Sequence, residues 1–238
     1  MSSLFRKKIV VIGGSSGIGL ATVELLIEAG ATVTAVARDP EKLQHVSERY
    51  PTVKTRIVDA ADRINLDRFF KEEGTFDHLI VTVSGGKGAG MFTSLNLNDL
   101  MSGFEAKFFP QLNAVQAALP YLGNSSSITL VTAISSRSRM PGTSGLAAIN
   151  GALEAMLPTL AKELKPVRIN AVSPGVVDTD WWKFPDEESK RKVFSKYANN
   201  IPVGRVAKAN DIAEILVFLT SNEYITGSVI EADGGLRL

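Results

Sequence analysis

The sequence contains no cysteine, so disulfides, iron–sulfur clusters and thiolate zinc sites are all excluded. Its two histidines, His45 and His78, stand far apart and lack the spacing of metal ligands, and we therefore predict no metal site. Neither sign of charge predominates, because 26 Lys and Arg against 25 Asp and Glu leave a net charge of +1. A nearly neutral chain lacks the excess of positive charge that attracts the phosphate backbone of a nucleic acid, and we predict no nucleic-acid partner.

Long hydrophobic runs are also missing. After the charged segment 1–8, only the four apolar residues 9–12 precede the first glycines, which is too short for a signal sequence or a membrane span. We therefore expect no membrane association and a cytoplasmic location. The chain has no internal repeat, low-complexity tract or linker. Because 238 residues with 45% hydrophobic content suffice for one sizeable core, we predict a single domain over residues 1–238.

Short β-branched runs alternate with segments of helical periodicity. The predicted strands cover residues 9–12, 31–37, 53–58, 78–83, 128–133, 167–172 and 228–230, and the clearest helices cover 17–29, 99–121, 144–164 and 211–221. This alternation predicts an α/β fold of Rossmann type: a doubly wound three-layer sandwich around a mainly parallel, seven-stranded sheet. The longest irregular segments, 84–98 and 174–185, are expected beside the ligand crevice at the carboxyl ends of the strands.

A glycine-rich turn follows the first predicted strand and leads directly into an amphipathic helix. Glycines permit a tight turn and a close approach of the backbone to a pyrophosphate, and the free N–H groups of the helix start attract its negative charge. A merely flexible turn is the alternative, which the order of strand, turn and helix disfavours. The predicted dinucleotide-binding residues of this turn are Gly13, Ser15, Ser16, Gly17, Ile18 and Gly19.

Two residues at the ends of the next strands bear on the choice of dinucleotide. Arg38 follows the second strand, where a guanidinium can bind a ribose 2′-phosphate, so NADP(H) is predicted in preference to NAD(H). The alternative for Arg38 is a solvated surface arginine, and the adjacent Asp39 weighs toward that alternative. Asp59 ends the third strand and is predicted to accept a hydrogen bond from the adenine amino group; its alternative role is a helix N-cap.

From residue 8 to 238 the chain resembles the short-chain dehydrogenase/reductase family. The resemblance rests on the glycine motif 13–19, on Asp59, on residues 169–179 and on the tail 201–235, although Ile12 stands where the family usually has threonine. It implies the Rossmann-type fold and a homotetramer or homodimer built on the helices 99–121 and 144–164. Further cofactor contacts implied by the resemblance are Ala60, Ser84, Gly85, Asn150, Pro174, Gly175, Val177 and Thr179.

The family's catalytic residues are not reproduced. Alignment places Ala133 at its serine position, Leu146 at its tyrosine position and Asn150 at its lysine position, whereas Lys107 stands where the family has an asparagine. Lysine and asparagine have thus been exchanged. Because hydride transfer to a carbonyl builds negative charge on oxygen, a proton donor is needed nearby. We predict Lys107, Ser135 and Asn150 as the catalytic residues; a surface lysine on a helix is the alternative for Lys107.

Three other features are candidate parts of the substrate site. Lys87 lies in a glycine-rich loop and is predicted either to approach a phosphate or carboxylate or to belong to a mobile loop. Arg137 follows the fifth strand and would bind an acid, or be solvated. Trp181 and Trp182 occupy the segment that forms a substrate lid in the family, with core or oligomer packing as their alternative.

These features predict an NADP(H)-dependent oxidoreductase that reduces a carbonyl or oxidises an alcohol on a small molecule that the sequence does not identify. Reduction of an activated C=C bond or imine is a second enzymatic hypothesis. The contrasting hypothesis is a non-catalytic NADP(H)-binding sensor or scaffold, since an intact glycine turn without the family's catalytic side chains is what such a protein would show.

Overall fold

The computed structural model describes residues 4–238 and is built around one seven-stranded sheet. Its strand order is β3-β2-β1-β4-β5-β6-β9, and every pairing within the sheet is parallel. The strands are β1 (Lys8–Ile12), β2 (Thr32–Ala37), β3 (Lys54–Ile57), β4 (Phe76–Val81), β5 (Leu122–Val131), β6 (Arg168–Pro174) and β9 (Val229–Ala232). The predicted Rossmann-type fold is confirmed.

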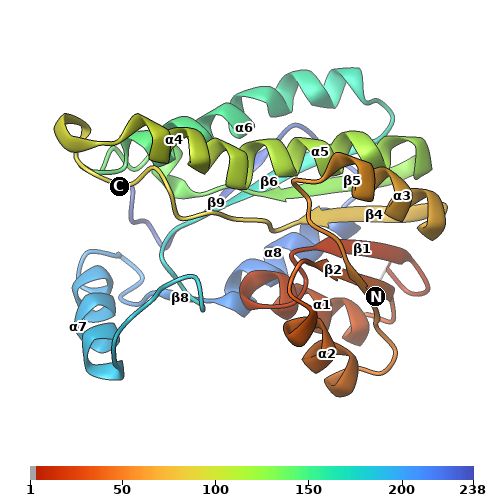
Figure 1. The fold of residues 1–238 in the computed structure, drawn as a ribbon, viewed down its shortest axis with the longest axis horizontal. Helices are drawn as coiled ribbons and strands as arrows, with labels where there is room; N and C mark the ends of the chain where they lie inside the picture. The colour runs from red at the N-terminus through yellow and green to blue at the C-terminus, as the bar shows by residue number, and fades with distance from the viewer. Residues whose placement is uncertain (1–3) are drawn as a thin grey trace.

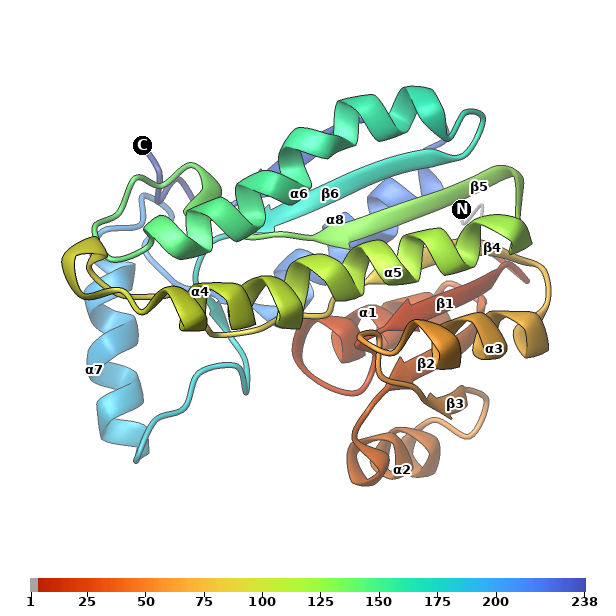
Figure 2. The same ribbon diagram turned by 45° about the horizontal axis from the view of Figure 1, so that its top comes forward.

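Helices cover both faces of the sheet (Figure 1). One face carries α3 (Arg63–Glu73), α5 (Phe109–Ala118) and α6 (Ser144–Glu163), and the other carries α1 (Gly17–Glu28), α2 (Pro40–Arg49) and α8 (Ala209–Ser221). Figure 2 shows α5 and α6 in front of β5 and β6, with α1 and α8 behind the sheet. Beyond the carboxyl ends of the strands lie α4 (Leu97–Gly103) and α7 (Glu187–Ala198), and the two-residue strands β7 (Val177–Asp178) and β8 (Ala207–Lys208) pair there.

Central strands are hydrophobic because both of their faces are covered. All seven residues of β6 are buried, as are the last six of β5. Two of the covering helices begin at an aspartate that caps them: the Asp39 carboxylate accepts from the Lys42 amide at the start of α2, and the Asp62 carboxylate accepts from the Asn65 amide at the start of α3.

The predicted helix 99–121 is not one regular helix. After α4, residues Phe104–Phe108 form a π-helical turn, α5 follows, and Leu119–Tyr121 form a 3₁₀ turn. Pro110 accounts for the change, because it has no amide proton to continue the ladder of i to i−4 hydrogen bonds. The amide of Phe109 instead donates to the Phe104 carbonyl, five residues back.

Asp59 does not cap a helix, so that alternative was wrong. Its carboxylate accepts from the amide of Ala61 at 2.9 Å, while Asp62 caps α3. The helices α2, α3 and α7 were not among those identified from sequence, since charged and polar residues predominate in all three. No helix within residues 4–238 is long and apolar enough to cross a membrane.

The core under α3 and α5 is anchored by an aromatic group. Phe70 is fully buried, and its ring centroid lies 4.8 Å from that of Phe69, 5.5 Å from that of Phe76 and 6.4 Å from that of Tyr121. This group packs α3 against the start of β4 and the turn that follows α5. It therefore holds α3 on the sheet at the end away from the crevice.

Replacing Phe70 by alanine is therefore expected to lower the free energy of unfolding by about 3–5 kcal/mol, since the ring leaves a cavity that the neighbouring rings cannot fill. Urea denaturation measures this change. Ile64→Ala on the same helix is the control: its side chain is 74% exposed, and the expected loss is below about 0.5 kcal/mol. Equal losses in the two variants would contradict the assignment of Phe70 to the core.

Candidate active site

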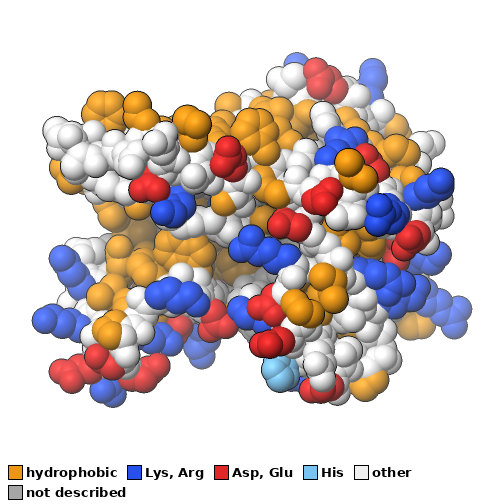
Figure 3. Space-filling view, viewed as in Figure 1, with side chains coloured by type: hydrophobic (Ala, Val, Ile, Leu, Met, Phe, Trp, Pro, Cys, Tyr) orange, Lys and Arg blue, Asp and Glu red, His pale blue; other side chains and the backbone are white. Residues whose placement is uncertain are grey.

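A crevice of about 790 Å³ lies at the carboxyl ends of the strands. It is located where the strand order reverses, between β1 and β4, which is the usual ligand position in an open parallel sheet. Figure 3 shows the surface hollowed between the part that carries α4 and the part that carries α7, with hydrophobic side chains in the hollow. The loops that follow β1, β4, β5 and β6 supply its walls.

The glycine turn forms one end of this crevice. Gly13 has a φ of +92°, and a Cβ there would lie 2.4 Å from Thr82 Oγ1. A Cβ on Gly19 would lie 2.0 Å from the carbonyl oxygen of Gly13. Both positions thus require glycine for space, and Gly13 also for its conformation. Ser16, the N-cap of α1, makes no side-chain cap hydrogen bond, so the helix start faces the crevice with its amides available to a ligand.

Two cations and a carboxylate lie where β2 ends. Arg38, Asp39 and Lys42 all line the crevice. The Asp39 carboxylate is engaged by the Lys42 amide as the cap of α2. Arg38 is exposed and, among residues 4–238, makes no hydrogen bond or ion pair. The side chain free to meet a ligand at this end is therefore the guanidinium rather than the adjacent carboxylate.

All the residues predicted to bind the dinucleotide line this one crevice. They come from the turn after β1, the ends of β2, β3 and β4, helix α6 and the segment after β6: Gly13, Ser15, Ser16, Gly17, Ile18, Gly19, Arg38, Asp59, Ala60, Ser84, Gly85, Asn150, Pro174, Gly175, Val177 and Thr179. Lys107 and Ser135 line it as well.

Lys107 is buried at the floor of the crevice. The π-helical turn places its side chain inward, the residue is only 5% exposed, and Nζ donates to the carbonyl oxygen of Thr132 at 2.9 Å. Thr132 directly follows β5, so the amine lies at the carboxyl end of a central strand. The alternative of a solvated surface lysine is thereby wrong.

The Glu154 carboxylate, whose negative charge acts on Lys107, is bound by other donors. Glu154 Oε1 accepts from Thr132 Oγ1 at 2.7 Å and from Ser173 Oγ at 2.8 Å, and Oε2 pairs with Arg137 at 3.2 Å. Burial lowers the pKa of Lys107 from 10.5 to about 7, and the negative charge of Glu154 opposes this effect only in part. The amine is therefore poised to exchange a proton near neutral pH.

Asn150 and Ser135 meet beside this lysine-bearing floor. Asn150 Nδ2 donates to Ser135 Oγ at 3.1 Å and to the Leu146 carbonyl at 2.9 Å. Asn150 Oδ1 is buried and has no hydrogen-bond partner among the described residues. An unpaired buried oxygen is costly unless a ligand donates to it, and Asn150 is among the residues that line the crevice.

The far end of the crevice is apolar and aromatic. Trp181 and Trp182 line it together with Tyr197 of α7. Trp182 also packs against Phe184, Phe194 and Tyr197, and its Nε1 donates to the Val177 carbonyl at 3.0 Å. Trp182 therefore has the predicted packing role, at the centre of the aromatic cluster of the α7 segment. Trp181 is 46% exposed and lines the crevice, and its role as a lid stays a prediction.

Two cations suggested from sequence do not face a ligand. Lys87 Nζ donates to Asp99 at 3.0 Å, and Lys87 is not among the residues that line the crevice. Arg137 pairs with both Glu154 and Glu231. Sequence reasoning missed several crevice residues, namely Lys42, Thr82, Tyr197 and Leu236. No local pattern singles these out, because only the tertiary fold brings them to the crevice.

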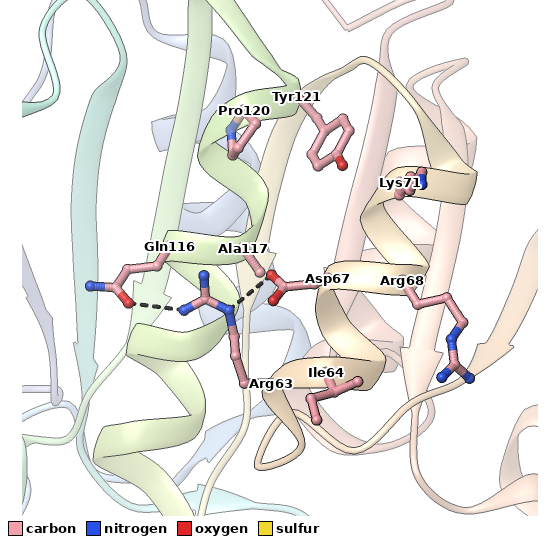
Figure 4. A pocket seen from close by; sticks show the side chains of 9 residues that line it. All are labelled: Arg63, Ile64, Asp67, Arg68, Lys71, Gln116, Ala117, Pro120 and Tyr121. Atoms are coloured by element: carbon pink, nitrogen blue, oxygen red, sulfur yellow. Dashed lines mark hydrogen bonds and ion pairs between the residues drawn. The ribbon is translucent and has the colours of Figure 1, made fainter.

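A second hollow of about 440 Å³ lies between α3 and α5, away from the crevice. Figure 4 shows Arg63 extended across it, bonded to Asp67 at 2.9 Å and to the side chain of Gln116 at 3.0 Å. Its guanidinium thus tethers the two helices to each other. No buried polar group points into this hollow, and we assign it no function.

The chain is similar in sequence and in structure to known proteins. Residues 12–237 match the family model described as enoyl-(acyl carrier protein) reductase. The 3-oxoacyl-[acyl-carrier-protein] reductase of Bos taurus is 30% identical over 98% of each chain. A small-chain dehydrogenase in complex with NADPH shares 33% identity and superposes with a TM-score of 0.84, over 98% of this chain and 99% of that one.

A second solved structure has a comparable overall likeness. It is an NADPH-bound short-chain oxidoreductase from Pseudomonas aeruginosa, described as containing an atypical catalytic centre. It is 30% identical with a TM-score of 0.90, covering 99% of this chain and 98% of that chain.

The lowered pKa of Lys107 predicts a pH-dependent difference in stability between the protein and its Lys107→Met variant. Between pH 7 and 10.5 the unfolded chain holds the lysine proton and the folded chain does not, so the stability contributed at this residue rises with pH over that window. The variant lacks this rise. From pH 6 to 9, the unfolding free energy of the variant relative to the original protein should therefore fall by about 2–3 kcal/mol.

Chemical denaturation of both proteins at the two pH values measures this difference, in which the contributions of all other titrating groups cancel. Lys87→Met is the matched control, since Lys87 is an exposed lysine paired with Asp99. A difference that does not change with pH would show that Lys107 is protonated throughout.

Proposed function

The chain belongs to the short-chain dehydrogenase/reductase family, and on that premise we propose that it is an NADP(H)-dependent oxidoreductase that reduces a carbonyl, or oxidises an alcohol, on a small molecule. The observation that carries the proposal is the convergence of all the predicted dinucleotide-binding residues, together with Lys107, Ser135 and Asn150, on one crevice. We further propose that residues 1–238 act as one NAD(P)-binding domain.

Two features of the crevice fit the dinucleotide. At Gly13 a Cβ would collide with Thr82, and at Gly19 a Cβ would collide with the Gly13 carbonyl. Such a tight glycine turn brings the amides at the start of α1 within reach of a pyrophosphate. The unpartnered Asn150 Oδ1 offers an acceptor to a ribose hydroxyl. When bound, the nicotinamide supplies the hydride; the chain holds it, excludes water and handles the proton.

The choice of NADP(H) rests on the end of β2. Arg38 has no partner among the described residues, Lys42 lines the same end of the crevice, and Asp39 is engaged as a helix cap. A free guanidinium with a second cation nearby favours a 2′-phosphate over a bare ribose hydroxyl. Two structural neighbours of the chain were solved with NADPH.

The proposed catalytic centre lacks the family's tyrosine and lysine. Leu146 lines the crevice at the tyrosine position, and Asn150 occupies the lysine position. Lys107 reaches the same floor from the opposite helix, so it can restore a proton donor with a pKa near 7. The Ser135 hydroxyl accepts from Asn150 and keeps its own proton to donate to a substrate oxygen.

A second copy of the chain is the proposed partner, as a homodimer or homotetramer. Large hydrophobic side chains are exposed along α4 and α5, with Leu97 at 64%, Met101 at 60% and Phe109 at 52%. On α6, a Cβ added to Gly151 would meet nothing within 4 Å. An apolar surface with room for close helix packing is typical of an interface between subunits. A cytoplasmic location stays a prediction.

Calorimetric titration tests the cofactor. The protein is expected to bind NADPH in the micromolar range and NADH far more weakly. Arg38→Ala should weaken NADPH binding roughly 10–100-fold, because a charge-assisted contact to the 2′-phosphate is lost, and should leave NADH binding unchanged. Arg56→Ala is the matched control, since Arg56 is an exposed arginine of β3 outside the crevice. If the protein binds neither NADPH nor NADH, the proposed function is overturned.

Turnover is tested by NADPH oxidation with a panel of aldehydes, ketones and activated alkenes. Lys107→Met is expected to lower kcat at least about 100-fold, as loss of a general acid does, while NADPH affinity changes by less than about threefold. Lys87→Met should retain the full rate. Tight NADPH binding with no turnover of any compound would instead support a non-catalytic sensor or scaffold.

A further inference from the structure

The surroundings of Lys107 favour the neutral amine over the ammonium ion. An ammonium group has three N–H donors, but the described residues offer Nζ only one acceptor, the Thr132 carbonyl. Lys107 forms no ion pair within the described part of the chain, and both oxygens of Glu154, whose charge acts on Lys107, are occupied by other donors. A buried ammonium without a counter-ion is costly, so the unprotonated form is the one this site accommodates.

A neutral amine carries a lone pair and is a nucleophile. Lys107 lines the crevice although it is only 5% exposed, so the amine faces the ligand space rather than bulk water. The hydrogen bond to the Thr132 carbonyl uses one N–H and orients the nitrogen, and the π-helical turn holds the backbone beneath it. Schiff-base lysines are typically desolvated in this way.

We propose that Lys107 is a covalent capture site, at which Nζ condenses with the carbonyl group of a small aldehyde or ketone. The nitrogen lone pair forms a bond to the carbonyl carbon, and the nitrogen gives up its two protons while the oxygen takes up two. The C–O bond then breaks, water leaves, and an imine remains. The Ser135 hydroxyl, whose proton is not committed to Asn150, can donate to the departing oxygen. The inference rests on the proposed function in one respect only, namely that the crevice admits a carbonyl compound.

The walls of the crevice define the class of carbonyl compound. They include Leu146, Met140 and Trp181, and Arg137 is paired with Glu154 and Glu231. An uncharged compound with an apolar or aromatic substituent fits these walls. A hydride delivered to the imine carbon would leave the substrate attached as a secondary amine. Turnover through capture therefore requires another acceptor carbon, as in an α,β-unsaturated aldehyde or ketone.

Reductive trapping tests the proposal without any nicotinamide. The protein is incubated at neutral pH with benzaldehyde and cyanoborohydride, which converts an imine into a stable benzylamine, and is then digested with trypsin and mapped by mass spectrometry. The expected result is one benzyl group per chain at Lys107, seen as a missed cleavage after that residue. Its labelling should be at least about tenfold faster than that of Lys87, an exposed lysine that is paired with Asp99.

Comparison of Lys107 with Lys87 within one digest makes the result independent of whether a variant folds. Lys107→Met and Lys107→Arg should each remove the preferred label and leave the slow labelling of surface lysines unchanged. Labelling of Lys107 no faster than that of Lys87 would overturn the proposal. Because no cofactor is present, loss of NADPH binding would overturn the proposed function without affecting this result.

Discussion

The Glu154 carboxylate connects the carboxyl ends of the central strands, and the character of the crevice depends on it. It accepts from Thr132 after β5 and from Ser173 in β6, and through Arg137 it is joined to Glu231 of β9. Four elements are thereby fixed around one buried charge that is already neutralised by Arg137. Lys107 lies beyond this network and gains little from it, so burial dominates its protonation state.

The exchange of lysine and asparagine leaves both residue types in the same crevice, at positions far apart in the sequence. Lys107 and Asn150 stand on different helices, but both line the same floor, and each reaches a group that follows β5. The amine at this floor thus comes from the segment opposite α6. The change from an ordinary amine to one with a pKa near 7 follows from burial at that new position, which the charge of Glu154, already paired with Arg137, opposes only in part.

Sequence patterns were sufficient for the sheet and for the glycine turn that forms one end of the crevice, because glycine spacing and β-branched runs are local signals. They were insufficient where tertiary contacts decide. Pro110 breaks the expected helix into α and π segments, and Lys107 is the buried residue of the π-helical turn. Likewise, Tyr197 comes to the crevice only because the aromatic cluster of α7 folds back over it.

The position of the tryptophans gives the molecule a built-in optical probe. The chain has two tryptophans, Trp181 and Trp182, and both line the crevice in contact with each other. Their emission therefore originates entirely at the mouth of the ligand site, with no background from elsewhere in the fold. Any molecule that enters, or any movement of the α7 segment, changes the surroundings of these two indoles, so occupancy of the crevice can be followed in real time without a label.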